Sequence, residues 1–136
     1  MAPANAPAAK RYVIQKDMLK EIIPTRQIPN EPRRVWFMDD EMDLIVWFGE
    51  SDEIIGFQLC DDKGRNEHAL TWFRAKGYSF ERVDDGEGDP GHPKMTPVLL
   101  ADGSHCINRL LPRFSHRAGS VPKYLRNFVI AKLRAF

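Results

Sequence analysis

Residues 42–60, MDLIVWFGESDEIIGFQLC, decide the fold of this chain. Two runs rich in β-branched and aromatic residues, Met42–Gly49 and Ile54–Cys60, flank the short polar segment Glu50–Glu53. Apolar runs bounded by Gly, Asp and Ser are typical of the two strands of a β-hairpin. The sequence therefore predicts a hairpin, and the register of its strands determines which side chains enter the core.

A two-residue turn at Ser51-Asp52 predicts that Asp43 pairs with Cys60 and that Trp47 covers Gly56. In that register one face is wholly apolar and consists of Leu44, Val46, Phe48, Ile55, Phe57 and Leu59. Each of these side chains gains about 1.5–3 kcal/mol when it is buried rather than exposed. A three-residue loop, Ser51–Glu53, would shift the pairing by one residue and split the apolar layer with Gly56 and Gln58. We therefore expect the first register, in which Ile45, Trp47 and Ile54 make the second face half apolar.

Runs rich in β-branched and aromatic residues also predict strands at Arg34–Met38, Glu67–Arg74 and Tyr78–Val83. Thr96–Ala101 is another apolar run, and Pro97 places it at an edge because proline cannot donate to the ladder. These strands are joined by short polar turns. The sequence predicts an antiparallel meander of five to six strands.

Two helices are predicted after the sheet. The first begins near Ser104 and carries apolar residues at helical spacing, and Pro112 is expected to kink it or end it early. The second is capped by Ser120, has Pro122 in its first turn, and buries a stripe made of Val121, Leu125, Phe128, Val129 and Leu133. The predicted fold is therefore α+β, with the meander covered by two C-terminal helices.

The predicted domain occupies residues 33–136. Residues 1–32 are expected to form a flexible N-terminal extension, with a short helix over residues 11–23 because Ile14, Met18 and Ile22 recur at helical spacing. Met1–Ala9 is rich in Ala and Pro and lacks the charged-then-apolar order of a signal peptide. No apolar run approaches the length of a membrane span. We expect a cytoplasmic protein with no membrane association.

Charge is distributed unevenly along the chain. Residues 39–89 contain fifteen Asp and Glu and five Lys and Arg, whereas residues 103–136 contain seven Lys and Arg and no acid. In one interpretation the basic helices pack against the acidic sheet and neutralise it. In the other the basic C-terminal helix, with Lys123, Arg126, Lys132 and Arg134 pointing outward, contacts an acidic protein or nucleic acid.

The hairpin also allows an enzymatic interpretation. Asp43 opens one strand, and Asp61-Asp62-Lys63 closes the next, which is similar to the PD-(D/E)xK nuclease pattern. Two carboxylates would hold Mg²⁺, the metal would activate water, and Lys63 would orient the attack. In the expected register, however, Asp43 and Asp61 point to opposite faces, because side chains alternate along a strand. A metal-dependent phosphodiesterase is therefore the alternative function, and the carboxylates are otherwise turn and edge residues.

Other polar groups offer weaker candidates. The segment Asp84–Pro93 is expected to be a solvated loop, and its polar residues are the candidates for a binding loop or a cation site: Asp84, Asp85, Glu87, Asp89 and His92. Its spacing does not match an EF-hand. Cys60 and Cys106 are expected to be free thiols, although the sequence also permits a disulfide. The aromatic residues of the strands could stack on nucleic acid, but the acid of this segment makes nucleic acid unfavourable on the sheet. No metal site and no cofactor are predicted.

The run Gly56–Lys63 (GFQLCDDK), followed by Ala69–Trp72 (ALTW) and Val83–Gly86 (VDDG), resembles a group of small uncharacterised bacterial proteins over residues 34–134. The resemblance implies a single bacterial domain and no particular activity. From the residues we expect a non-enzymatic binding or protein-interaction module. Its partner is unidentified, and a homodimer through the half-apolar sheet face is a further expectation.

Overall fold

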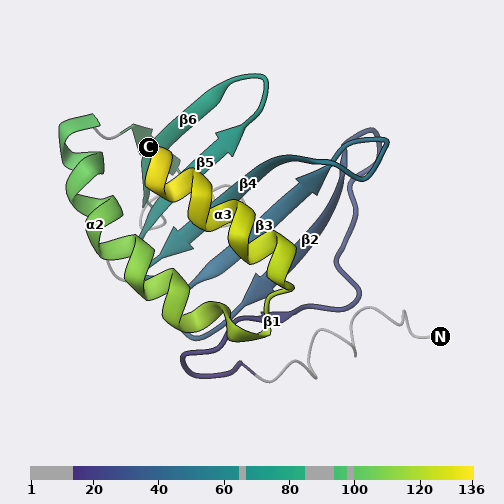
Figure 1. Ribbon diagram of the computed structural model, residues 1–136, viewed down its shortest axis with the longest axis horizontal. Coiled ribbons are helices and arrows are strands. Elements are labelled where there is room, and N and C mark those ends of the chain that lie inside the picture. The colour runs from purple at the N-terminus through teal and green to yellow at the C-terminus, as the bar shows by residue number, and fades with distance from the viewer. Residues whose placement is uncertain (1–13, 65–66, 85–93, 98–99) are drawn as a thin grey trace.

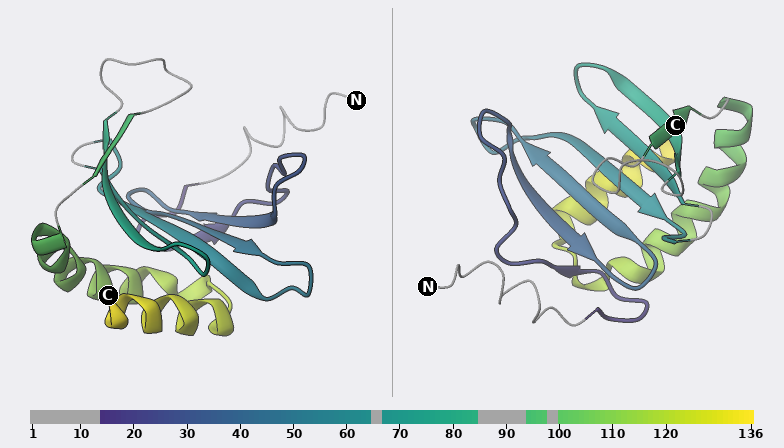
Figure 2. Two further views of the ribbon diagram at one scale, coloured as in Figure 1. Left: turned by 90° about the horizontal axis from the view of Figure 1, so that it is seen from above. Right: turned by 180° about the vertical axis from the view of Figure 1, so that it is seen from behind.

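The fold is a seven-stranded antiparallel sheet with two helices on one of its faces (Figures 1 and 2). The computed structural model describes residues 14–64, 67–84, 94–97 and 100–136. Strand order follows chain order from β1 to β7, so every connection joins neighbouring strands. The predicted α+β meander is confirmed, with a longer sheet than the expected five to six strands.

The elements are bounded as follows. The strands are β1 (Lys20–Glu21), β2 (Arg33–Met38), β3 (Asp43–Phe48), β4 (Ile54–Asp61), β5 (His68–Phe73), β6 (Gly77–Asp84) and β7 (Lys94–Pro97). The helices are α2 (Leu100–Arg117), the 3-10 turn η1 (Ala118–Ser120) and α3 (Lys123–Ala135). β7 lies at the sheet edge, as Pro97 predicts, but the expected bounds Thr96–Ala101 are wrong: the strand ends at Pro97, and Leu100 and Ala101 belong to α2.

The hairpin β3–β4 has the predicted register from Asp43 to Trp47. Asp43 pairs with Cys60, and Trp47 pairs with Gly56. The predicted two-residue turn is wrong: Gly49 N donates to Glu53 O at 2.8 Å, which leaves a three-residue loop, 50–52. Phe48 then pairs with Ile54, so one extra residue on β4 restores the register.

That extra residue is Ile55, and the bulge exchanges two neighbouring side chains. Ile54, which the two-residue turn would place on the second face, packs against the core, and Ile55 is only half-buried. A bulge of this kind is common near the end of a hairpin. It keeps both Phe48 and Ile54 on the core side, so the apolar layer is preserved although the turn differs from the expected one.

The core lies between the sheet and the two helices. Its buried side chains alternate along each strand and recur along the helices, as the apolar patterns predict. They include Leu44, Val46, Phe48, Phe57, Leu59, Leu70, Trp72 and Phe80 from the sheet and Ile107, Leu110, Phe114, Leu125, Val129 and Leu133 from the helices. Among the described elements, no helix lies on the opposite sheet face (Figure 2, right).

Gly56 permits close packing on this opposite face. A Cβ atom at this position would lie 2.3 Å from Cδ1 of Phe73 and 2.9 Å from the carbonyl oxygen of Trp72. Phe73 therefore lies directly over the glycine. Its ring centroid is 5.0 Å from that of Trp47, so the two aromatic rings meet above β4.

The N-terminal part of the described chain differs from the expectation. Residues 14–23 form no helix: Asp17 has a φ of 59°, which a right-handed helix does not accommodate, and Lys20–Glu21 pairs with β2. Leu19 is fully buried, and its N–H donates to Arg117 O at 2.9 Å. The folded unit therefore includes residues that the sequence assigned to a flexible extension.

The remaining edge of β2 is closed by Gln27. Its amide nitrogen donates to Arg34 O at 2.7 Å, and its amide oxygen accepts from Arg34 N at 3.0 Å. Ile22 N also donates to Trp36 O at 2.8 Å. One side chain thus replaces a neighbouring strand and blocks further pairing at this edge.

The boundaries of the two C-terminal helices differ from the predicted ones. α2 begins at Leu100, not near Ser104, and continues through Pro112 to Arg117, so the early end at Pro112 is wrong. α3 has Pro122 as its N-cap residue, not Ser120. Its predicted buried stripe is present, with Phe128 partly exposed.

Candidate functional site

Two turns at one end of the sheet gather the carboxylates. The first turn, 39–42, joins β2 to β3 and is organised by Asp39, whose Oδ1 accepts the N–H groups of Glu41 and Met42, both at 2.8 Å. Asp39 is fully buried. A short acidic side chain that accepts backbone N–H groups two and three residues ahead is the usual way to stabilise a turn. The role of Asp39 in this turn is therefore structural.

The second turn, 61–64, follows β4 and lies beside the first. Asp62 has a φ of 59° and Gly64 a φ of 77°, so the chain reverses within a few residues. Lys63 reaches across to the first turn, and its Nζ donates to Asp39 O and to Asp43 Oδ1, each at 3.0 Å. The lysine thereby joins the two turns.

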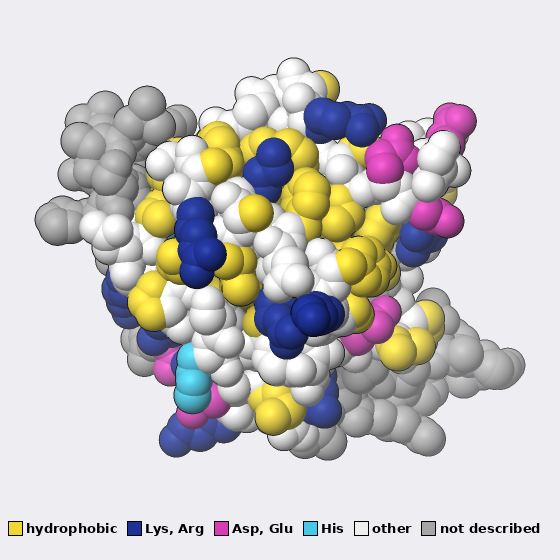
Figure 3. Space-filling model, viewed as in Figure 1, with side chains coloured by type: hydrophobic (Ala, Val, Ile, Leu, Met, Phe, Trp, Pro, Cys, Tyr) yellow, Lys and Arg dark blue, Asp and Glu magenta, His cyan; other side chains and the backbone are white. Residues whose placement is uncertain are grey.

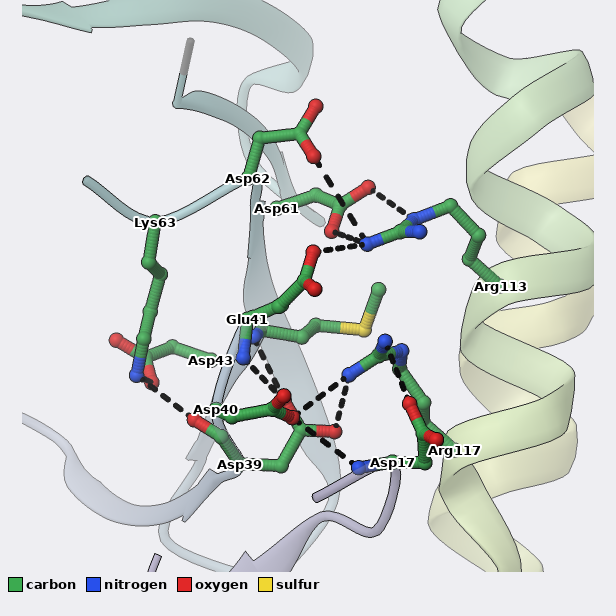
Figure 4. A network of polar contacts seen from close by, with 11 residues as sticks. Asp17, Asp39, Asp40, Glu41, Asp43, Asp61, Asp62, Lys63, Arg113 and Arg117 are labelled. Atoms are coloured by element: carbon green, nitrogen blue, oxygen red, sulfur yellow. Dashed lines mark hydrogen bonds and ion pairs between the residues drawn. The ribbon is translucent and has the colours of Figure 1, made fainter. Parts of the chain in front are cut away.

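Three arginines of α2 pair with these turns, and two of them, Arg113 and Arg117, are shown in Figure 4. They recur at intervals of four residues, which places them on one side of the helix. Arg109 pairs with Asp62 at 2.8 Å, Arg113 with Asp61 at 2.8 Å, and Arg117 with Asp39 at 2.8 Å. The interval of four between these arginines is the signal in the sequence that marks this site, and the strand and turn patterns do not reveal it.

Arg113 occupies the centre of the network. It binds Asp61 through two nitrogens and also donates to Glu41 Oε1 at 3.0 Å. Its hydrogen bonds to Asp61 are the largest cause that raises the pKa of this guanidinium. Asp61 is 6% exposed, so its carboxylate depends on the arginine for compensation.

Arg117 joins three parts of the chain. Its side chain pairs with Asp39, with Asp40 at 3.2 Å and with Asp17 at 2.9 Å. Although burial opposes the charge, hydrogen bonds to Asp39 and Asp40 raise the pKa of Arg117. The arginine thereby holds the N-terminal segment and the first acidic turn against the end of α2.

The predicted nuclease residues do not form one site. Asp61 points to the helix side and is held by Arg113, whereas Asp43 lies on the other face with Lys63. The register forces this separation, because Asp43 pairs with Cys60, the neighbour of Asp61. The carboxylates that would hold a metal in the nuclease pattern are therefore on opposite faces.

Asp43 is a largely buried carboxyl on the uncovered face. Burial raises the pKa of Asp43 above its ordinary value of 3.8, and the ion pair with Lys63 only partly opposes this. Nearby, Trp36 Nε1 is buried and makes no hydrogen bond of normal geometry among the described residues, although the indole also acts to lower the pKa of Asp43. Burial and the neighbouring Asp43 also raise the pKa of the free thiol of Cys60. None of these groups is poised as a nucleophile or metal ligand.

The other predicted site residues fall in two regions. Asp84 ends β6, and the residues 85, 87, 89 and 92 lie outside the described part of the chain. Lys123, Arg126 and Arg134 lie on α3, with Lys123 and Arg134 exposed and Arg126 half-buried. Within the described ranges, no group of three His, Cys, Asp or Glu is arranged to hold a metal ion.

The basic residues of the two helices therefore have different surroundings. The arginines of α2 pair with the sheet carboxylates, whereas no carboxylate in the described residues pairs with a cation of α3. Lys132 instead lies over the Trp72 ring, with Nζ 4.2 Å from its centroid. Neutralisation of the acidic sheet, the first interpretation of the charge pattern, applies to α2 and not to α3.

The chain matches no protein-family model, no curated protein and no solved structure. Among the described residues, no helix is long and apolar enough to cross a membrane.

Proposed function

We propose that this protein is a non-enzymatic interaction module that binds an acidic segment of a protein partner on the outer face of α3. The observation that carries the proposal is the division of the basic residues between the two helices. The arginines of α2 form ion pairs with the carboxylates of the sheet, whereas the cations of α3 remain available to an external anion. An excess of charge of one sign indicates a binding surface only where the charged side chains are exposed to solvent.

The binding surface is a stripe along α3 consisting of Lys123, Arg126, Ile130 and Arg134. These residues follow one another at intervals of three or four, which places them on one side of the helix. Dark-blue Lys and Arg side chains lie over the middle of the helix-covered face in Figure 3, and the magenta acidic side chains lie toward its margins. An anionic partner that approaches this face meets positive charge first.

Apolar groups on the same helix favour a protein partner over nucleic acid. Tyr124 is 62% exposed, and Ile130 is half-buried within the stripe. Tyrosine and arginine with an apolar centre are typical of protein interfaces. Duplex nucleic acid instead requires many phosphate contacts, and α3 supplies few cations and lies flat on the sheet (Figure 1).

The alternative, a metal-dependent phosphodiesterase, lacks support from the arrangement of its residues. Asp43 and Asp61 are committed to different cations on different faces. The cytoplasmic location, the bacterial origin and the membership in a group of small bacterial proteins remain predictions from the sequence.

The experiment is a binding titration followed by fluorescence anisotropy. The probe is a fluorescein-labelled amphipathic peptide in which Glu alternates with Leu and Phe, and a labelled single-stranded and a labelled double-stranded DNA are titrated in parallel. We expect the peptide to bind, the affinity to fall with salt, and the variant Lys123→Glu/Arg134→Glu to lose about tenfold or more in affinity.

The matched control is Lys16→Glu/Arg26→Glu, which makes the same change in net charge at two exposed positions away from α3. It should bind the peptide nearly as well as the unmodified protein. The proposal is wrong if the peptide does not bind, if both double variants weaken binding equally, or if only DNA binds.

A further inference from the structure

The sheet face opposite the helices carries a partly exposed aromatic and aliphatic surface. Trp36 and Ile45 form one row with polar Gln58 and Thr71, and Trp47 and Phe73 form the next row across Gly56. The large apolar side chains on this face are half-buried. Among the described elements, no helix or strand packs on them (Figure 2).

The size of this face is suitable for association with another protein surface. Five strands, β2–β6, at spacings of about 4.8 Å and with about six residues of 3.4 Å each, span roughly 500 Å² in projection. Side chains raise the accessible area above the projected area. A standard interface buries about 800 Å² on each partner, which is of the same order as the area of this face. A single opposed sheet would therefore cover most of this surface.

Two charged groups of opposite sign lie near the two ends of β6. Arg74 and Lys76 lie in the turn between β5 and β6, where they border a groove with Phe73 and Ile55. Glu81 lies near the other end of β6 and pairs across the sheet with Ala69. Because Phe80 is in the core, Glu81 points to the uncovered face.

These charges do not pair with one another within one chain. Lys76 and Glu81 are five residues apart along β6, or about 17 Å in an extended strand. In the described residues neither takes part in an ion pair, and Arg74 has only a long contact of 3.4 Å with Glu53 at the surface. A partner surface with an acidic residue opposite Lys76 and a basic residue opposite Glu81 would therefore complement this face.

We propose that the occupant of this face is a second copy of the chain, related by a twofold axis that lies between the sheets and across the strands. Such an axis places each strand over its own copy and reverses its direction. Lys76 of one copy then lies over Glu81 of the other, and the contact occurs twice. An axis parallel to the strands and through the middle of the sheet would instead place β6 over β2 of the other copy, so Lys76 would not meet Glu81.

The twofold arrangement makes a specific prediction for charge-reversal variants. In a dimer of Lys76→Glu, both contacts oppose two glutamates, and in a dimer of Glu81→Lys both contacts oppose two lysines. In a mixed dimer of the two variants, both contacts again join opposite charges. The double variant Lys76→Glu/Glu81→Lys also restores both contacts in its own dimer.

The experiment is sedimentation equilibrium over a range of protein concentrations, with circular dichroism to confirm that each variant is folded. We expect the unmodified protein to dimerise, and each single variant to dimerise about tenfold or more weakly. An equimolar mixture of the two single variants, and the double variant, should regain most of the lost affinity.

Two control variants separate this inference from the proposed function. Trp47→Glu places a charge at the centre of the face and should give a folded monomer, whereas Lys123→Glu/Arg134→Glu on the other side should leave dimerisation unchanged. The inference fails if the unmodified protein is monomeric up to about 1 mM. It also fails if the mixed single variants associate no better than either variant alone.

Discussion

Arg113 binds both carboxylate oxygens of Asp61, with Nε 2.8 Å from Oδ2 and Nη2 2.8 Å from Oδ1. The pair joins the middle of α2 to the last residue of β4. Bidentate pairs of this kind are geometrically specific and stronger than single contacts. The relationship therefore fixes the position of α2 along the sheet as well as neutralising a buried charge.

Replacing Arg113 with methionine should destabilise the fold. Asp61 would keep its buried charge without its main partner, and the expected loss is about 2 kcal/mol in the free energy of unfolding, less than for a fully buried pair because the side chain of Arg113 is 25% exposed. Urea unfolding followed by tryptophan fluorescence measures this loss. Arg113→Met/Asp61→Asn should recover part of the stability, because the stranded charge is removed.

The matched control is Asp52→Asn, which breaks the exposed pair between Arg33 and Asp52. Asparagine tolerates the φ of 62° at this position, so the backbone is unaffected. The expected change is below about 0.5 kcal/mol. Equal losses at the two sites would contradict the assignment of Asp61 and Arg113 as a stabilising contact.

Replacing Gly56 with alanine should also be destabilising. The new methyl group would overlap Phe73 and approach the fixed carbonyl of Trp72, and overpacking of this kind costs about 1–3 kcal/mol. Thermal or urea unfolding provides the measurement. Gly119→Ala is the control, because nothing lies within 4 Å of its added Cβ, and it should be nearly neutral.

Gln27→Ala should open the edge of β2 without unfolding the protein. The Arg34 amide loses its acceptor, so its hydrogen exchange should accelerate by about tenfold or more, while the global free energy of unfolding changes by less than about 1 kcal/mol. Amide exchange followed by NMR resolves this single position. Gln27→Glu retains an acceptor for the Arg34 N–H and should keep most of its protection; equal acceleration in both variants would refute the role of the side-chain oxygen.

The contribution of Asp43 to stability should depend on pH with a definite sign. Its pKa is raised in the folded protein, mainly by burial, so the ionised form is less favourable in the folded than in the unfolded chain. Its contribution is therefore greatest below the ordinary pKa of 3.8 and declines as pH rises through the raised pKa. Asp43→Asn removes this decline.

Urea unfolding of the unmodified protein and of Asp43→Asn across a series of pH values provides the measurement. The difference in free energy of unfolding, unmodified protein minus variant, should decrease as pH rises from acid toward neutrality. A difference that increases over the same range would mean that the ion pair with Lys63 outweighs burial.

Much of the fold follows from alternation along the strands. The register from Asp43 to Trp47 could be predicted because only one pairing places Leu44, Val46 and their partners on a single face. The turn could not, because a three-residue loop with a bulge at Ile55 buries an equivalent apolar layer, with Ile54 in the place that a two-residue turn gives to Ile55. Apolar burial thus specifies the face of a strand more strongly than it specifies the loop that follows it.

The N-terminal segment shows where periodicity misleads. Ile14, Met18 and Ile22 are spaced as in a helix, yet Ile14 is 49% exposed and Met18 is 39% exposed. Leu19 is the residue that enters the core, and pairing with β2 outweighs the weak local preference for helix. The candidate site had a clearer signal, the interval of four between Arg109, Arg113 and Arg117, but their acidic partners are distant in sequence.

The contacts of Asp17 and Leu19 with Arg117 set a limit for shortening the chain. A fragment that begins at residue 33 would contain every long strand and both helices. It would lack the buried side chain of Leu19 and the side chain of Gln27, which closes the β2 edge. The bare edge strand could then recruit a strand from another molecule and lead to aggregation. The shortest fragment useful for crystallisation or NMR should therefore retain the segment from Ile14 onward.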